Sequence, residues 1–141
     1  RAHLYRAVLE GVSFALKHNI DAGSQGAATL DDKLIVVGGA AHSPLWMQII
    51  ADVTGYQVYT IAENVEAALG AALLAALGAG LISRETAQQG WVTLVPRSTP
   101  QPEASAAYRR AFGRYRDAYP ALQGLMHRIH HDHQDHHDQQ E

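Results

Sequence analysis

The spacing of apolar and polar residues along the chain predicts alternating helices and strands. A fully apolar run around Val36 is typical of a buried strand, whereas residues 57–61 alternate in the way expected of a shorter, half-buried strand. Apolar residues recur at helical spacing in four further stretches, which are residues 1–18, 44–54, 65–80 and 103–118. The order strand, helix, strand, helix predicts an α/β fold.

Serine, proline and glycine residues mark the ends of these elements. Ser43 and Pro44 form an N-cap and first-turn proline pair, and Gly55 stands where a helix-ending glycine is expected. Gly38 and Gly39 follow the first strand, and a backbone without Cβ atoms lets a ligand approach closely. Ligands of open α/β sheets lodge beyond the carboxyl ends of strands, where a helix N-terminus favours phosphate. The glycine turn is therefore either a nucleotide-binding loop or a tight connection that binds nothing.

The predicted sheet is small. Residues 92–95 can add a strand at its edge, and three prolines between residues 96 and 102 then predict an extended linker to the last helix. Two or three strands are few, because a typical sheet holds about five or six. We therefore expect the sheet to be incomplete, with its remaining strands upstream of residue 1. An open sheet edge favours self-association, so a homo-oligomer is among the expected states.

The charge and hydropathy of the chain bear on whether it binds nucleic acids or membranes. The formal net charge is -3, and four arginines gather with aromatic residues between positions 108 and 119. This pattern predicts an amphipathic helix with a solvated basic face, and no nucleic-acid partner is expected. The apolar stretch at residues 65–81 is shorter than the roughly twenty residues of a membrane span, so it predicts a buried helix and no membrane partner. The chain has no cysteine and no visible signal sequence, which fits a cytoplasmic protein.

The last fifteen residues have a distinct composition. Residues 127–141 hold six of the nine histidines and three aspartates. No apolar periodicity continues there, so the segment is expected to be a disordered tail. Imidazole binds Zn²⁺, Ni²⁺ and Cu²⁺, and weak metal binding by the tail is expected. No residue is assigned to a dedicated metal site, because the sequence shows no further groups that would orient such ligands.

Five motifs in series point to one family of enzymes. They are residues 1–16, Gly38-Gly39-Ala40, Ser43-Pro44-Leu45-Trp46 with Gln48, Ala51-Asp52-Val53, and the alanine-rich residues 66–72. In this order and spacing they resemble the C-terminal domain of FGGY-type carbohydrate kinases over about residues 1–95, with the xylulokinase-like branch closer. The resemblance implies a partial actin-like ATPase domain of the ribonuclease H-like class. Together with the composition of the last fifteen residues, it divides the chain into a nucleotide-side domain at residues 1–126, lacking its first strands, and the tail at residues 127–141.

The resemblance also implies a function. Members of the family transfer phosphate from ATP, with Mg²⁺, to a hydroxyl group of a sugar or polyol, and a pentulose-type sugar is favoured here. The carried-over cofactor-binding residues are Gly38, Gly39 and Ala40, which lie against adenosine in the family, and Ser43, which contacts the base. The family's catalytic aspartate and most sugar contacts belong to the first domain. No catalytic residue is therefore assigned, and the chain is expected to be inactive alone.

A second hypothesis comes from a different class of protein. The chain would then be a non-catalytic module on a degenerate kinase domain, which binds metal through its histidines or forms oligomers. Deletion of residues 127–141 distinguishes the two hypotheses. Loss of assembly or of bound metal, in a chain that binds no nucleotide, would favour the module.

Overall fold

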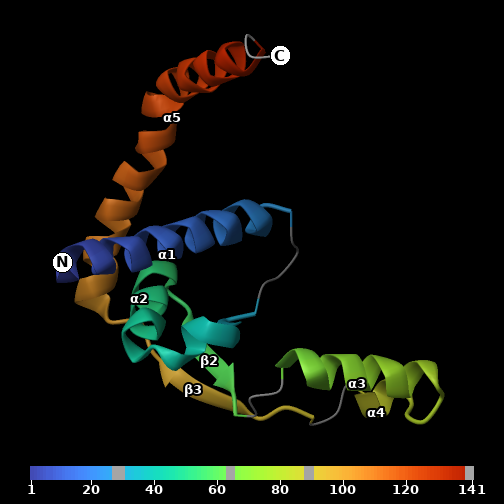
Figure 1. Cartoon of the computed structure of the whole chain (residues 1–141). Coiled ribbons are helices and arrows are strands. Elements are labelled where there is room, and N and C mark those ends of the chain that lie inside the picture. The colour runs from blue at the N-terminus through green and yellow to red at the C-terminus, as the bar shows by residue number, and fades with distance from the viewer. Residues whose placement is uncertain (27–30, 63–65, 88–90, 139–141) are drawn as a thin grey trace.

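The computed structural model describes residues 1–26, 31–62, 66–87 and 91–138. The elements follow one another as α1 (Ala2–Ser24), β1 (Lys33–Ile35), the 3₁₀ turn η1 (Gly38–His42), α2 (Pro44–Thr54), β2 (Gln57–Ile61), α3 (Glu66–Gly78), α4 (Arg84–Ala87), β3 (Leu94–Ser98) and α5 (Pro102–Asp138) (Figure 1). The predicted helix at residues 44–54 and the predicted strand at residues 57–61 are confirmed at both ends. The first helix continues past residue 18 to Ser24.

Three strands in the described residues form one mixed sheet in the order β1-β2-β3. β1 pairs parallel to β2, and β3 pairs antiparallel to β2 with an irregularity between Val58 and Tyr59. The expectation of an incomplete α/β sheet flanked by helices is confirmed. The expectation of a buried first strand is wrong, because β1 lies at the edge of the described sheet and Ile35 is about half exposed.

The third strand corrects the prediction for the proline-rich segment. Pro96 lies within β3, although residues 96–102 were expected to form an extended linker. A proline donates no ladder hydrogen bond, yet an edge strand tolerates it because one side of the strand needs no partner. β3 is such an edge strand, so the segment joins the sheet before the chain enters α5.

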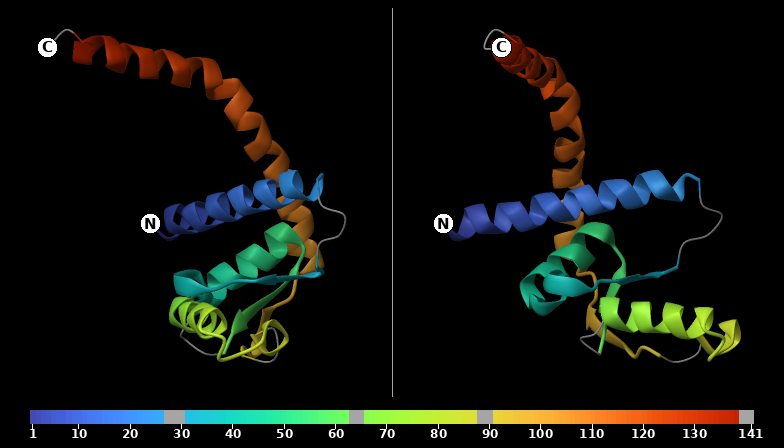
Figure 2. Two further views of the ribbon diagram at one scale, coloured as in Figure 1. Left: turned by 90° about the vertical axis from the view of Figure 1, so that its right-hand side faces the viewer. Right: turned by 45° about the vertical axis from the view of Figure 1, so that its right-hand side comes forward.

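Helix α2 is the centre of the core. Its residues Ile49 and Val53 face a cluster that also holds residues of α1 and α5, and Met47, Ile50 and Ala51 face a second cluster with Val58 of β2. α2 therefore lies between the sheet on one side and α1 with α5 on the other (Figure 2). The sheet and the helices hold α2 in place, and α2 begins directly after the glycine turn.

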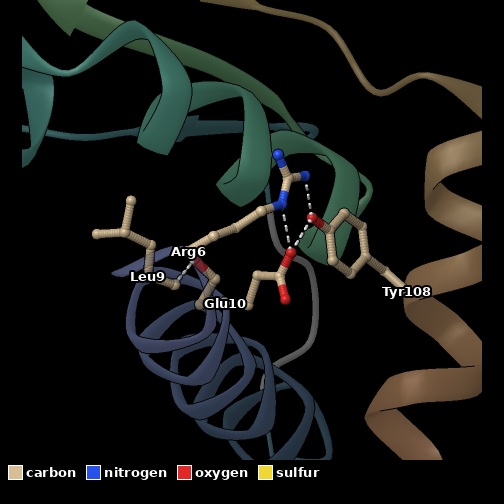
Figure 3. Close-up of polar contacts among 5 residues, drawn as sticks. Arg6, Leu9, Glu10 and Tyr108 are labelled. Carbon is tan, nitrogen blue, oxygen red and sulfur yellow. Dashed lines mark hydrogen bonds and ion pairs between the residues drawn. The ribbon is translucent and has the colours of Figure 1, made fainter. Parts of the chain in front are cut away.

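Polar side chains join α1 to α5 beside this core. Arg6 Nε donates to Glu10 Oε1 at 2.8 Å, and the Tyr108 hydroxyl of α5 donates to the same oxygen at 2.8 Å. Arg6 Nη2 donates to the Tyr108 oxygen at 2.9 Å, which closes the triad (Figure 3). The triad links residues about a hundred positions apart and fixes where α5 crosses α1.

This triad makes stability depend on pH in the alkaline range. Burial raises the pKa of Tyr108 above its ordinary value of 10.0, and its hydrogen bond to Glu10 acts in the same direction. A group whose pKa rises on folding stabilises the folded state below its unfolded pKa, and loses that contribution as pH rises through the folded pKa. We expect the free energy of unfolding, measured with urea, to decline above about pH 10. Tyr108→Phe should flatten the decline, whereas Tyr5→Phe on α1 should not; equal declines in both variants would contradict the coupling.

Helix α3 is more exposed than its sequence predicts. Its sequence is apolar on nearly every face, which predicts burial. In the structure the described residues of α3 are exposed or half-buried, and the element that α3 contacts most is the short helix α4 (Figure 1). Leu74 is among its exposed side chains. The expectation of a buried helix at residues 65–81 is wrong for the described part of the chain, because an apolar helix is buried only where another surface covers it.

Helix α5 is longer than predicted. It was expected to end near Ala118, and residues 127–141 were expected to be disordered, yet the helix continues through Pro120 to Asp138. Leu122, Met126 and Ile129 continue the helical spacing beyond the proline, and residues 125–138 contain neither glycine nor proline to end the helix. The predicted tail is therefore helical as far as Asp138, and residues 139–141 lie outside the described residues. The division of the chain at residue 126 stays a prediction.

Candidate functional site

The glycine turn follows β1 directly, at the carboxyl end of that strand, and forms η1. Gly38 has a φ of +75°, a conformation that L side chains rarely adopt, so the backbone itself requires glycine there. Gly39 has no such φ, and a Cβ added to it meets nothing within 4 Å. Neither the backbone nor packing within the described chain accounts for glycine at position 39. The space over Gly39 is open in the described chain.

Ser43 forms the junction between the turn and α2. Its Oγ accepts a hydrogen bond from the Trp46 backbone N–H at 3.3 Å, and its own backbone N–H donates to the Ala40 carbonyl at 3.1 Å. The predicted N-cap is confirmed, as is the helix end at Gly55, where φ is +84°. A hydroxyl that accepts one hydrogen bond still carries a hydrogen that it can donate to a ligand.

Two hydrogen bonds hold the turn to the sheet. The Val36 N–H donates to the Tyr59 carbonyl of β2 at 2.8 Å, and Arg97 Nη2 of β3 donates to the Ala41 carbonyl at 3.2 Å. Sequence reasoning missed Arg97, because it assigned this residue to a linker. No local pattern marks a contact between residues 56 positions apart. Arg97 therefore brings a positive charge to the base of the turn.

Two hollows lie near the turn and the start of α2. One, of about 330 Å³, lies between α1 and β1, and its apolar walls include Leu16, Val37, Ala40 and Trp46. The Nε1 of Trp46 is buried and has no hydrogen-bond partner among the described residues, which costs about 1–3 kcal/mol unless an acceptor reaches it. The second hollow, of about 280 Å³, is bordered by Arg97 and other residues of α2 and β3. The apolar hollow therefore reaches the turn at Ala40, whereas the second hollow lies beside the first residues of α2.

The segment between β3 and α5 is fastened to α2 through one carboxylate. Asp52 Oδ1 accepts hydrogen bonds from the Gln101 backbone N–H at 2.7 Å and from Gln48 Nε2 at 3.0 Å. Gln48 Nε2 also donates to the Thr99 carbonyl at 3.0 Å. Gln48 and Asp52 lie four residues apart on one face of α2. These hydrogen bonds hold residues 99–101 against the second half of α2.

We expect Asp52→Ala to lower the free energy of unfolding by about 2–3 kcal/mol. Asp52 is 6% exposed, so its removal leaves the Gln101 N–H without its acceptor in a place that water reaches poorly. Urea unfolding measures the loss. Asp52→Asn keeps an acceptor oxygen and should lose clearly less. Equal stabilities for Asp52→Ala and the wild-type chain would contradict this role.

The four predicted binding residues lie together, because Gly38, Gly39 and Ala40 belong to η1 and Ser43 is its C-cap. An exposed turn, an apolar hollow and a free hydroxyl donor fit the adenosine part of a nucleotide. Among the residues whose side chains are described, no three histidine, cysteine or acidic residues gather to hold a metal ion. Asp31 and Asp32 precede β1, at the end of the strand away from the turn.

Comparisons with known proteins agree with this arrangement. The sequence profile of the C-terminal domain of the FGGY family of carbohydrate kinases matches residues 1–79, which include the whole turn and α2. The chain is 34% identical over 130 residues to the L-xylulose/3-keto-L-gulonate kinase of Escherichia coli (strain K12), covering 92% of this chain and 26% of that protein. It is 30% identical over 128 residues to the autoinducer-2 kinase of Salmonella paratyphi B (strain ATCC BAA-1250 / SPB7), covering 89% of this chain and 24% of that protein.

The fold leads to the same group of proteins. The crystal structure of xylulose kinase from Rhodospirillum rubrum matches with a TM-score of 0.72 and 30% identity, covering 89% of this chain and 25% of that chain. The chain thus spans about a quarter of the length of the relatives that it matches. No described helix is both long enough and apolar enough to cross a membrane. The motifs, the actin-like α/β topology and the profile match to residues 1–79 all lead to one family. The chain belongs to the FGGY family of carbohydrate kinases, and it corresponds to the C-terminal domain of that family.

Proposed function

We propose that this chain is the ATP-side portion of a kinase that phosphorylates a hydroxyl group of a sugar, with a pentulose-type sugar favoured. The observation that carries the proposal is the turn at residues 38–43, which lies inside the family match and leaves open space over Gly39. Relatives named for xylulose support a pentulose, and the relative named for autoinducer-2 shows that substrates differ among the matches. Because the reaction uses ATP, we place it in the cytoplasm.

Each residue of the turn has a separate part in this proposal. Gly38 gives the backbone its direction, Gly39 and Ala40 lie against adenosine, and Ser43 donates its hydroxyl hydrogen to the base. Arg97 keeps the turn on the sheet through the Ala41 carbonyl. When bound, ATP supplies the phosphoryl group that the sugar hydroxyl receives. Phosphoryl transfer depends largely on positioning and on electrostatic stabilisation of phosphates, which a nucleotide-side domain supplies only in part.

The catalytic base and the sugar contacts are proposed to lie in a first domain. A base must come within hydrogen-bond reach of the attacking hydroxyl, so this domain alone is proposed to bind nucleotide without turning it over. Mg²⁺ is proposed to reach the site with the phosphates of ATP, since the described side chains offer it no set of ligands.

The test is sugar-stimulated ATP turnover by a longer chain in which a complete first domain precedes these residues. We expect turnover with xylulose or ribulose to exceed turnover with glycerol, and the 141-residue chain alone to show none. Failure of every sugar to stimulate turnover in a folded longer chain would contradict the proposal and favour the non-catalytic module.

A further inference from the structure

Helix α5 carries a regular apolar stripe along one face. Its members follow one another at alternating spacings of four and three residues, which is the heptad spacing of coiled coils. We call these residues the α5 seam; they are Tyr108, Phe112, Tyr115, Tyr119, Leu122, Met126 and Ile129. Residues at this spacing form one line along the side of a helix, so a partner helix can contact several of them at once.

The first half of the seam is already covered within the chain. Phe112 is buried, and Tyr108 and Tyr115 pack against it in the core cluster that α1 shares with α5. The second half is open, since Tyr119, Leu122, Met126 and Ile129 are between 48 and 57% exposed. Helix α5 carries this half away from the rest of the molecule in every view (Figures 1 and 2). One seam therefore continues from a packed interface into water.

A cavity lies where the seam leaves α1. It has a volume of about 590 Å³ and is lined by His18 of α1 and by residues of α5 that include Tyr115, Tyr119 and Leu122. The cavity borders both halves of the seam. A second helix that covers the open half passes beside this cavity.

We propose that the open half of the α5 seam binds the same segment of a second copy of this chain, with the two helices antiparallel. Tyr119 then lies opposite the partner's Ile129, and Leu122 lies opposite the partner's Met126. Every open seam residue is paired in this register, and the partner's helix passes beside the cavity at His18. Burial of large apolar side chains drives the association, at about 25 cal/mol per Å² of apolar surface removed from water.

The distribution of charge along α5 favours the antiparallel orientation. Four arginines occur in the sequence between residues 109 and 116, and three aspartates occur between residues 132 and 138. An antiparallel pair brings the acidic end of each helix toward the basic part of the other, whereas a parallel pair brings like charges together. The open seam shares no residue with the glycine turn, so this proposal is independent of the proposed function.

Sedimentation equilibrium on the full chain tests the association. The wild-type chain is expected at twice the 15.3 kDa chain mass, and Met126→Lys is expected at the chain mass. Leu74→Lys is the matched control, because Leu74 is also an exposed apolar helix residue but belongs to α3. It should remain dimeric, and circular dichroism should show the same helix content in all three proteins. A monomeric wild-type chain, or a Met126→Lys protein that stays dimeric, would overturn the proposal.

Single cysteines test the orientation, since the sequence has no cysteine of its own. In the antiparallel register, two copies of residue 119 lie about 15 Å apart along the helix axis, from a rise of 1.5 Å per residue. A disulfide requires Cα atoms within about 7 Å. Tyr119→Cys and Ile129→Cys should therefore cross-link when mixed and not when oxidised separately. Cross-linking of each variant by itself, as readily as in the mixture, would overturn the antiparallel arrangement.

Discussion

Replacing Phe14 with alanine is expected to lower the free energy of unfolding by about 3–5 kcal/mol, the usual range for a buried phenylalanine. The Phe14 ring lies 6.0, 5.9 and 5.5 Å from the rings of Tyr108, Phe112 and Tyr115, measured between centroids. All three partners belong to α5, so the substitution empties the centre of the α1–α5 contact. Domains are stable by roughly 5–15 kcal/mol, so this loss is a large fraction of the total.

Urea unfolding followed by circular dichroism measures this effect. Tyr5→Ala is the control, because Tyr5 lies on the same helix but is 63% exposed, and it should change stability by no more than about 0.5 kcal/mol. Phe14→Leu should fall between the two, since leucine fills part of the space. If Phe14→Ala were no less stable than Tyr5→Ala, the aromatic cluster would not be what holds α5 on α1.

In a longer chain that turns over ATP, Gly39→Leu is expected to raise the KM for ATP at least about tenfold, which corresponds to 1.4 kcal/mol of lost binding. A Cβ at position 39 meets no atom within 4 Å, so the described chain leaves room for the first carbon of a side chain there. The leucine would instead occupy space that the proposal gives to adenosine. The effect should therefore appear in nucleotide affinity and not in folding.

Two further variants, Gly39→Ala and Gly38→Ala, separate an effect on nucleotide affinity from an effect on folding. Gly39→Ala adds one carbon and should raise the KM for ATP less than Gly39→Leu, with the urea midpoint of both variants close to that of the parent. Gly38→Ala should instead lower the midpoint, because alanine is strained at a φ of +75°. An unchanged KM for ATP in Gly39→Leu would remove Gly39 from the nucleotide site.

Local signals explain which elements could be predicted from the sequence. Both ends of α2 carry such signals, Ser43 as the cap and Gly55 as the left-handed stop, and its predicted bounds are confirmed. The contact between Arg97 and the Ala41 carbonyl carries no local signal, since it depends on β3 reaching the sheet. Pro96 made β3 resemble a linker, because sequence alone does not show whether a strand lies at an edge.

Two further differences between prediction and structure concern the helices α3 and α5. An apolar sequence such as that of α3 predicts burial. Whether another part of the protein covers the helix depends on the tertiary structure, which the sequence of α3 alone does not reveal. In α5, the apolar periodicity predicted an end near residue 118, whereas residues that suit a helix on both sides of Pro120 carry it on to Asp138. For the turn, sequence predicted the position of the glycines. Only the structure separates Gly38, which the backbone requires, from Gly39, which it does not.

The most direct test of the central claim is a nuclear magnetic resonance titration of the nitrogen-15-labelled chain with adenosine and then with ATP. If residues 38–43 contact adenosine, both ligands should shift the same amide signals in this turn. The arginines between residues 109 and 116 serve as the internal control, since phosphate attraction alone would shift signals there with ATP and not with adenosine. Shifts confined to those arginines, or an unperturbed turn at saturating adenosine, would contradict the account.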